Sequence, residues 1–158
     1  VSKIDPLGVC SMYFQNKPVI TCPVRFRQNW SMIADAASFF FGEGATFMAL
    51  PEVRLKDRRG RQAGNIDYVL VKHDEAGRIL DFASLEVQAV YISGTIRGAF
   101  RTYMKSPNPD FEWKNVANYP QPDYLSTEQF LSPILSKGKL FNKLGKKQAI
   151  AVQTVFFQ

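Results

Sequence analysis

The sequence predicts an α/β fold in which helices flank a mixed β-sheet. Two observations lead to this prediction. Runs of β-forming residues alternate with segments whose apolar residues recur at helical spacing. Two of the strand-like runs, residues 66–72 and 79–92, are separated by a short turn and therefore predict a hairpin. At 158 residues, 46% of them hydrophobic, the chain can form a compact core.

The elements before the hairpin are a helix and a strand. Residues 29–41 have helical apolar spacing, with Asn29 or Ser31 as the expected cap and Gly42 or Gly44 as the expected end. Residues 46–55 predict a strand that Pro51 confines to an edge or a bend. A basic loop, residues 56–65, leads from this strand into the hairpin.

The elements after the hairpin are more varied. A helix is expected from Thr95 to Lys105, because its apolar residues fall on one face. We expect an ordered Pro-rich loop over 106–126, a short helix over 127–136 bent or split at Pro133, and a last strand over 148–157.

Charge and hydropathy narrow the class of protein. A formal net charge of +6 points to an anionic partner, of which nucleic acid is the commonest, although a basic domain without such a partner is the alternative. No apolar run reaches the roughly 18 residues that a membrane span needs, and the first residues lack the pattern of a signal peptide. We therefore expect a cytoplasmic protein with no membrane partner. Both ends of the chain read as cut, which suggests a fragment.

Three polar residues interrupt the apolar hairpin: Asp67, Glu86 and Gln88. Glu86 and Gln88 share one face of their strand, and folding the hairpin places Asp67 opposite Ser84 or Glu86. Two carboxylates at this separation repel each other unless a cation binds them. Hard oxygen ligands suit Mg²⁺, with the backbone carbonyl of Val87 as a further ligand. The alternative is a solvent-facing set of polar residues on the outer face of the hairpin.

The segments "PEVRLKDRRGRQAGNIDYVLV" and "DFASLEVQAVYISGTIRGAF" carry a family resemblance, together with "PLGVCS" and "ITCPVRFRQ" near the start. Over nearly the whole chain the sequence resembles the NotI-type restriction endonucleases, a branch of the PD-(D/E)xK nuclease superfamily. The resemblance implies a PD-(D/E)xK core over residues 29–158, preceded by a cysteine-containing metal-binding or DNA-contact segment over residues 1–28. It also implies a bacterial type II enzyme, a homodimer that hydrolyses both strands of a palindromic site in double-stranded DNA.

The resemblance also implies roles for individual residues. Asp67 and Glu86 match the carboxylates that hold the metal, and Glu52 matches an additional acid. Gln88 stands where most of the superfamily has a lysine, and the NotI branch also has a glutamine there. An amide can orient water but is neither charged nor basic. Cys10 and Cys22 match one pair of a four-cysteine site for structural iron. Zinc would suit four thiolates equally, and buried free thiols are the alternative.

Two groups of arginines are candidates for DNA contacts. One lies in the basic loop and the strand before it, and the other lies on the helix after the hairpin: Arg54, Arg58, Arg59 and Arg61, and then Arg97 and Arg101. A solvated loop is the alternative for the first group.

Two other functions of the protein stay open at this point. One is a different PD-(D/E)xK nuclease that acts in repair or on branched DNA, and the other is a catalytically inactive DNA-binding module.

Overall fold

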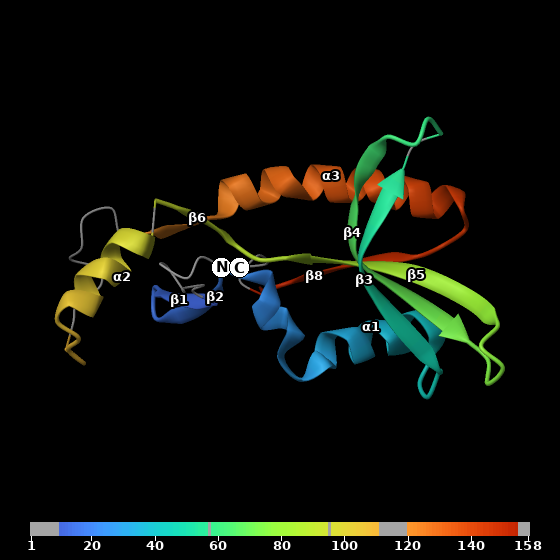
Figure 1. The fold of residues 1–158 in the computed structure, drawn as a ribbon, viewed down its shortest axis with the longest axis horizontal. Helices are drawn as coiled ribbons and strands as arrows, with labels where there is room; N and C mark the ends of the chain where they lie inside the picture. Colours follow the sequence, from blue (N-terminus) through green and yellow to red (C-terminus); the bar gives the residue numbers. More distant parts are fainter. Residues whose placement is uncertain (1–9, 57, 95, 111–119, 155–158) are drawn as a thin grey trace. The chain divides into compact units, whose positions relative to one another are not determined.

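The computed structural model describes residues 10–56, 58–94, 96–110 and 120–154 (Figure 1). The chain divides into two compact units. One contains Phe26–Gln88 with Phe130–Val152, and the other contains Val1–Arg25, Ala89–Gln129 and Gln153–Gln158. The first unit, called here the sheet unit, holds every acidic candidate of the sequence analysis. The predicted domain boundary at residue 28 stays a prediction, because compact units are not the same as folding domains.

A four-stranded mixed sheet forms the sheet unit. Its strands are β3 (Phe47–Lys56), β4 (Gln62–His73), β5 (Ile79–Gln88) and β8 (Gln148–Val152), in the order β3-β4-β5-β8. Strand β4 is antiparallel to both β3 and β5, whereas β8 runs parallel to β5. The predicted α/β architecture is thereby confirmed. So is the edge position of the strand with Pro51, which lacks the amide that a second neighbour would need.

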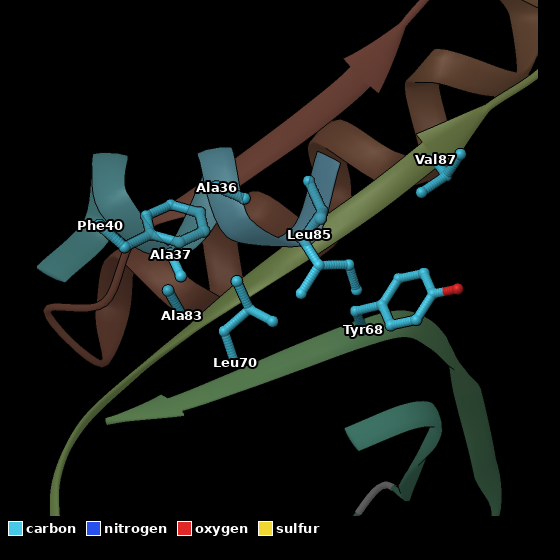
Figure 2. Close-up of a cluster of buried hydrophobic side chains, with 9 residues drawn as sticks. Ala36, Ala37, Phe40, Tyr68, Leu70, Ala83, Leu85 and Val87 are labelled. Carbon is cyan, nitrogen blue, oxygen red and sulfur yellow. The ribbon is translucent and has the colours of Figure 1, made fainter. Parts of the chain in front are cut away.

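Helix α1 (Ser31–Phe41) covers one face of this sheet. Figure 2 shows Ala36, Ala37 and Phe40 of α1 packed on side chains from β4 and β5, namely Tyr68, Leu70, Ala83, Leu85 and Val87. The helix ends at Gly42, whose φ of 87° few other residues adopt, so this part of the prediction is confirmed.

The expected side-chain cap of α1 is wrong. The helix starts after Trp30, which makes no side-chain cap hydrogen bond. Asn29 and Trp30 both have a φ of 55°, and they follow a 3₁₀ segment over Pro23–Trp30. The chain therefore enters the helix through two left-handed residues, and that geometry replaces the cap that Asn29 or Ser31 would have supplied.

Helix α3 (Tyr124–Lys143) covers the other face of the sheet from Phe130 onward (Figure 1). Ile134 and Phe141 are buried, and the Phe141 ring lies 6.4 Å from the ring of Phe82 on β5. The predicted short helix, bent or split at Pro133, is wrong because one 20-residue helix runs through the proline. Pro133 costs one helical hydrogen bond but is exposed, while the buried side chains that follow it stabilise the helix.

The described residues of the second unit form two small antiparallel ribbons, a helix and the first turns of α3. Strands β1 (Ser11–Phe14) and β2 (Lys17–Ile20) form a hairpin, and β6 (Tyr91–Ser93) pairs with β7 (Gln121–Asp123). Helix α2 (Ile96–Lys105) confirms the helix expected after Thr95. In the described part of the chain, no helix has both the length and the apolar character that a membrane crossing requires.

The single strand predicted over residues 79–92 is wrong. Strand β5 ends at Gln88, and β6 begins at Tyr91 in the other unit. The break follows from a new backbone partner, since the amide of Val90 donates to the carbonyl of Ile20 at 2.9 Å. The apolar pattern continues across the break because Val90 is buried with Met12 and Val19 in a separate small core. Parts of the predicted loop and of the last strand, residues 111–119 and 155–157, lie outside the described residues.

One ion pair connects the start of β5 to the turn after α3. Lys146 Nζ lies 2.7 Å from Asp81 Oδ1 and 5.0 Å from the centre of the Phe82 ring. The hydrogen bond from Lys146 lowers the pKa of Asp81 below its ordinary value of 3.8. The charged carboxylate therefore contributes stability above that ordinary pKa, and the contribution is lost as the pH falls through the lower pKa of the folded protein.

We expect Asp81→Asn to lower the free energy of unfolding by about 0.5 kcal/mol at pH 7, a small effect because both side chains are partly exposed. The difference from wild type should be smaller at about pH 3 than at pH 7, because the contribution of the carboxylate is lost as the pH falls toward its lowered pKa in the folded protein. Urea unfolding at the two pH values measures it, with the exposed Glu75→Gln as the matched control. An equal difference at both pH values would contradict the electrostatic origin.

Candidate active site

The β4–β5 ladder brings Asp67 and Glu86 together. Tyr68 pairs with Leu85 and Val69 with Ser84, so the register places Asp67 opposite Glu86, the second of the two predicted alternatives. The regular ladder stops at Tyr68. Beyond it, the amide of Val87 donates to Asp67 Oδ2 at 2.8 Å. The carboxylate of Asp67 therefore accepts the hydrogen bond that a backbone carbonyl of β4 would accept in a regular ladder, and this bond holds the side chain beside β5.

Glu86 is buried on the face of the sheet that α3 covers. Its neighbours Leu85 and Val87 point to the α1 core, whereas the Glu86 side chain, 2% exposed, points the other way. Lys137 Nζ on α3 lies 2.9 Å from each of its carboxylate oxygens. The same ammonium donates to the carbonyl of Asn65 at 2.6 Å. Only the contact to Oε2 has hydrogen-bond geometry, so Oε1 is buried with an ion-pair contact but without a hydrogen-bond partner among the described residues.

Burial dominates the electrostatics of Glu86. Desolvation raises the pKa of its carboxyl group, and the negative charge of Asp67 acts in the same direction. The hydrogen bond and the charge of Lys137 oppose this rise without cancelling it. A carboxylate in this position is costly to keep charged, so it favours a cation nearby.

Glu52 completes a row of acids across three strands. On β3, Pro51 pairs with Tyr68 and Val53 with Ile66, so Glu52 stands opposite Asp67. It has a φ of 56°, in the left-handed region that side-chain-bearing residues rarely adopt, and it is exposed. Strained backbone of this kind costs on the order of 1 kcal/mol and concentrates at functional sites. The register thus aligns Glu52, Asp67 and Glu86 on adjacent strands.

The acidic row is an alignment and not a closed cage. Within the part of the chain that the structure describes, no three His, Cys, Asp or Glu side chains converge as a set of metal ligands. Gln88 is half-buried at the end of β5, on the same face as Glu86, and pairs with Val152 of β8. The four predicted site residues therefore belong to one sheet: Glu52 and Asp67 lie near the middle of β3 and β4, and Glu86 and Gln88 lie at the end of β5.

The candidate DNA contacts are divided between the two units. Arg54 on β3 and Arg58, Arg59 and Arg61 at the β3–β4 turn are exposed in the sheet unit. Arg97 and Arg101 are exposed on α2, in the other unit. Their roles stay predictions.

The two cysteines flank the β1–β2 hairpin. The amide of Thr21 donates to the carbonyl of Cys10 at 3.2 Å, which places Cys10 and Cys22 near the open end of the ribbon. Both are free thiols. Two thiols supply half of a four-cysteine site, so the iron or zinc inferred from the resemblance stays a prediction.

Sequence reasoning missed Lys137. It lies three residues after Ile134 and four before Phe141, which are both buried, so it belongs to the buried stripe of α3. A cation at that spacing in an apolar stripe is the signal that would have marked it. Its partner Glu86 is 51 residues away in the chain, and nothing in the local sequence links the two.

Comparison with known families shows which family the chain belongs to. The family model described as restriction endonuclease NotI matches residues 3–158, essentially the whole chain. The protein therefore belongs to the NotI restriction endonuclease family, whose members are type II site-specific deoxyribonucleases. Membership confirms the resemblance seen in the sequence and implies a site-specific DNA endonuclease. None of the curated proteins compared with the chain matches it.

Proposed function

We propose that the protein is a Mg²⁺-dependent restriction endonuclease of PD-(D/E)xK type that hydrolyses phosphodiester bonds at a palindromic site in double-stranded DNA. The observation that carries the proposal is that the β4–β5 register places Asp67 opposite Glu86, with one Glu86 oxygen buried and lacking a hydrogen-bond partner among the described residues. Membership of the NotI family supplies the substrate class, DNA.

The residues fit a small hard cation. Carboxylates and carbonyls are the ligands that Mg²⁺ prefers, and it needs only one or two carboxylates from the protein. Asp67, Glu86 and the carbonyl of Val87 would hold it. Glu86 Oε1 makes an ion-pair contact with Lys137 Nζ at 2.9 Å but, among the described residues, no hydrogen bond. When bound, the metal lowers the pKa of a coordinated water and stabilises the charge that develops on the phosphate.

The other residues of the proposed site bind and orient. The Gln88 amide is proposed to hold the attacking water by hydrogen bonds, and Glu52 to add a carboxylate beside Asp67. The arginines of the β3–β4 turn are proposed to bind DNA phosphates or guanine edges, and Arg97 and Arg101 to bind phosphates closer to the cut. A homodimer would place two such sites about a two-fold axis, which matches the symmetry of a palindrome and allows both strands to be cut.

Plasmid cleavage with and without Mg²⁺ tests the proposal. We expect discrete fragments in Mg²⁺ and intact plasmid in EDTA. Non-specific degradation would indicate a different nuclease, one that acts in repair or on branched DNA. Intact plasmid that is nevertheless bound would indicate a catalytically inactive DNA-binding module.

Gln88→Ala is expected to lower the cleavage rate by about 100-fold, because a small misplacement of the attacking water costs this much. DNA affinity should change little. Gln88→Lys should be tolerated better than Ala, since its ammonium can reach the same water. Single-turnover cleavage of one duplex by the three proteins at saturating enzyme measures the effect. A Gln88→Ala protein that cuts at the wild-type rate would assign the water to another residue.

A further inference from the structure

Lys137 of α3 contacts three oxygen atoms on the strands β4 and β5. It extends from α3, its ammonium contacts both oxygens of Glu86 on β5 at 2.9 Å, and it donates to the carbonyl of Asn65 on β4 at 2.6 Å. Asn65 is two residues before Asp67. An ammonium fixed by a carboxylate and a carbonyl has lost the freedom of a surface lysine, so its charge occupies one defined place beside the acidic pair.

Lys137 is a cation on the otherwise apolar face of α3. Ile134 and Phe141, on the same face of α3, are buried, and an apolar side chain at 137 would continue their stripe at lower cost. Gly138 follows directly. A Cβ at Gly138 would lie 2.5 Å from Oε1 of Gln148, the end of a flexible side chain, so the Gln148 side chain lies against α3 beside Lys137.

The face of β5 under α3 is polar where the opposite face is apolar. Ser84 and Glu86 are buried there, and Gln148 of β8 pairs in register with Ser84. Among the described residues, Ser84 Oγ, Glu86 Oε1 and Gln148 Nε2 are buried without a hydrogen-bond partner. Polar groups left in this state usually mark a functional site. Lys137 donates a hydrogen bond to Oε2 of Glu86 and makes an ion-pair contact with Oε1.

The charge at the site is otherwise negative. Asp67 and Glu86 are acids, and Gln88, which follows on the same strand face, is neutral. Hydrolysis of a phosphodiester adds negative charge at the phosphate, and a fixed cation stabilises it. Gln88, the second residue after Glu86 on β5, is neutral and cannot supply that positive charge.

We propose that Lys137 is a positioning residue of the cleavage reaction, one that fixes Glu86 in the site and supplies from α3 the positive charge that Gln88 cannot provide. This inference rests on the proposed function. It predicts that a positive charge can be moved from residue 137 to residue 88 with partial recovery of cleavage.

The test compares five full-length proteins: wild type, Lys137→Met, Lys137→Arg, the double variant Lys137→Met/Gln88→Lys, and the matched control Lys139→Met, whose residue is exposed on the same helix. Single-turnover cleavage in Mg²⁺ and DNA affinity in Ca²⁺ are measured for each. We expect Lys137→Met to cut about 100-fold more slowly than Lys139→Met, with DNA affinity within about threefold of it. Lys137→Arg should retain most of the rate.

The double variant separates charge supply from structural support. We expect Gln88→Lys to raise the cleavage rate of Lys137→Met by about tenfold or more. The midpoint of urea unfolding should fall in Lys137→Met, because Glu86 is left buried without its cation. It should recover in a sixth protein made for this measurement alone, Lys137→Met/Glu86→Gln. These midpoints are read in EDTA and do not depend on activity.

Two results would overturn the inference: a Lys137→Met protein that cuts as fast as the control, or a double variant that stays as slow as Lys137→Met. A purely structural lysine would lower the unfolding midpoint without any rescue by Gln88→Lys. If wild type cuts no DNA in Mg²⁺, the proposed function fails and this inference fails with it. If wild type cuts and Lys137→Met cuts equally well, only the role of Lys137 is lost.

Discussion

Asp67→Asn is expected to abolish cleavage in Mg²⁺, a loss of at least about 1,000-fold, while DNA binding in Ca²⁺ stays equal or becomes tighter. The carboxylate supplies charge to the proposed metal, whereas the amide does not. The substitution also removes one negative charge that would face the DNA phosphates. The fold should persist, because the amide oxygen of Asn can still accept the hydrogen bond that the Val87 amide makes to Asp67.

Single-turnover cleavage and filter binding of the same duplex measure the two effects. Asp35→Asn, at an exposed acid on α1, is the matched control for the loss of one negative charge. Cleavage by Asp67→Asn at a rate close to that of the control would remove Asp67 from the site. Loss of binding together with loss of cleavage would indicate a fold defect instead.

Glu86→Gln is expected to separate activity from stability. Cleavage should fall by at least about 100-fold, because a carboxylate proposed to hold the metal is lost. The free energy of unfolding in EDTA at pH 8 should not fall, and should rise by up to about 1 kcal/mol. Burial raises the pKa of Glu86, which means that the folded protein holds its charged form at a cost. The neutral amide removes that cost and can still accept a hydrogen bond from Lys137.

Urea unfolding and single-turnover cleavage on the same preparations test this prediction. Glu75→Gln, at an exposed position, is the control for removing a carboxylate without changing a buried site. A decrease in stability larger than about 1 kcal/mol would mean that the Lys137–Glu86 pair chiefly supports the fold.

The sheet and most of the acidic row could be predicted because their signals are local. Alternation of apolar and polar residues on β4 and β5, with a short turn between them, limits the register to two alternatives, and the structure selects the one that pairs Asp67 with Glu86. The spacing of apolar residues likewise predicts α1 and α2. These elements carry their own pattern within about ten residues.

The remaining features depend on contacts that no short window contains. Pro133 reads as a helix breaker, but burial of Ile134 and Phe141 against the sheet keeps α3 continuous. The apolar run after Gln88 reads as one strand, but its second half joins another small core. Lys137 reads as a surface lysine until α3 docks beside Glu86.

The parallel pairing of β8 with β5 has a consequence for the order of folding. Ser84 pairs with Gln148, so this edge of the sheet closes only after a long intervening segment has been synthesised and has folded back. The β4–β5 hairpin, in contrast, needs only neighbouring residues, so Asp67 and Glu86 meet early on a nascent chain. The ammonium from α3 arrives late. We therefore expect a ribosome-bound chain without α3 and β8 to have Asp67 and Glu86 in register but to lack Lys137 beside them, so that the proposed site forms only after both elements have been synthesised.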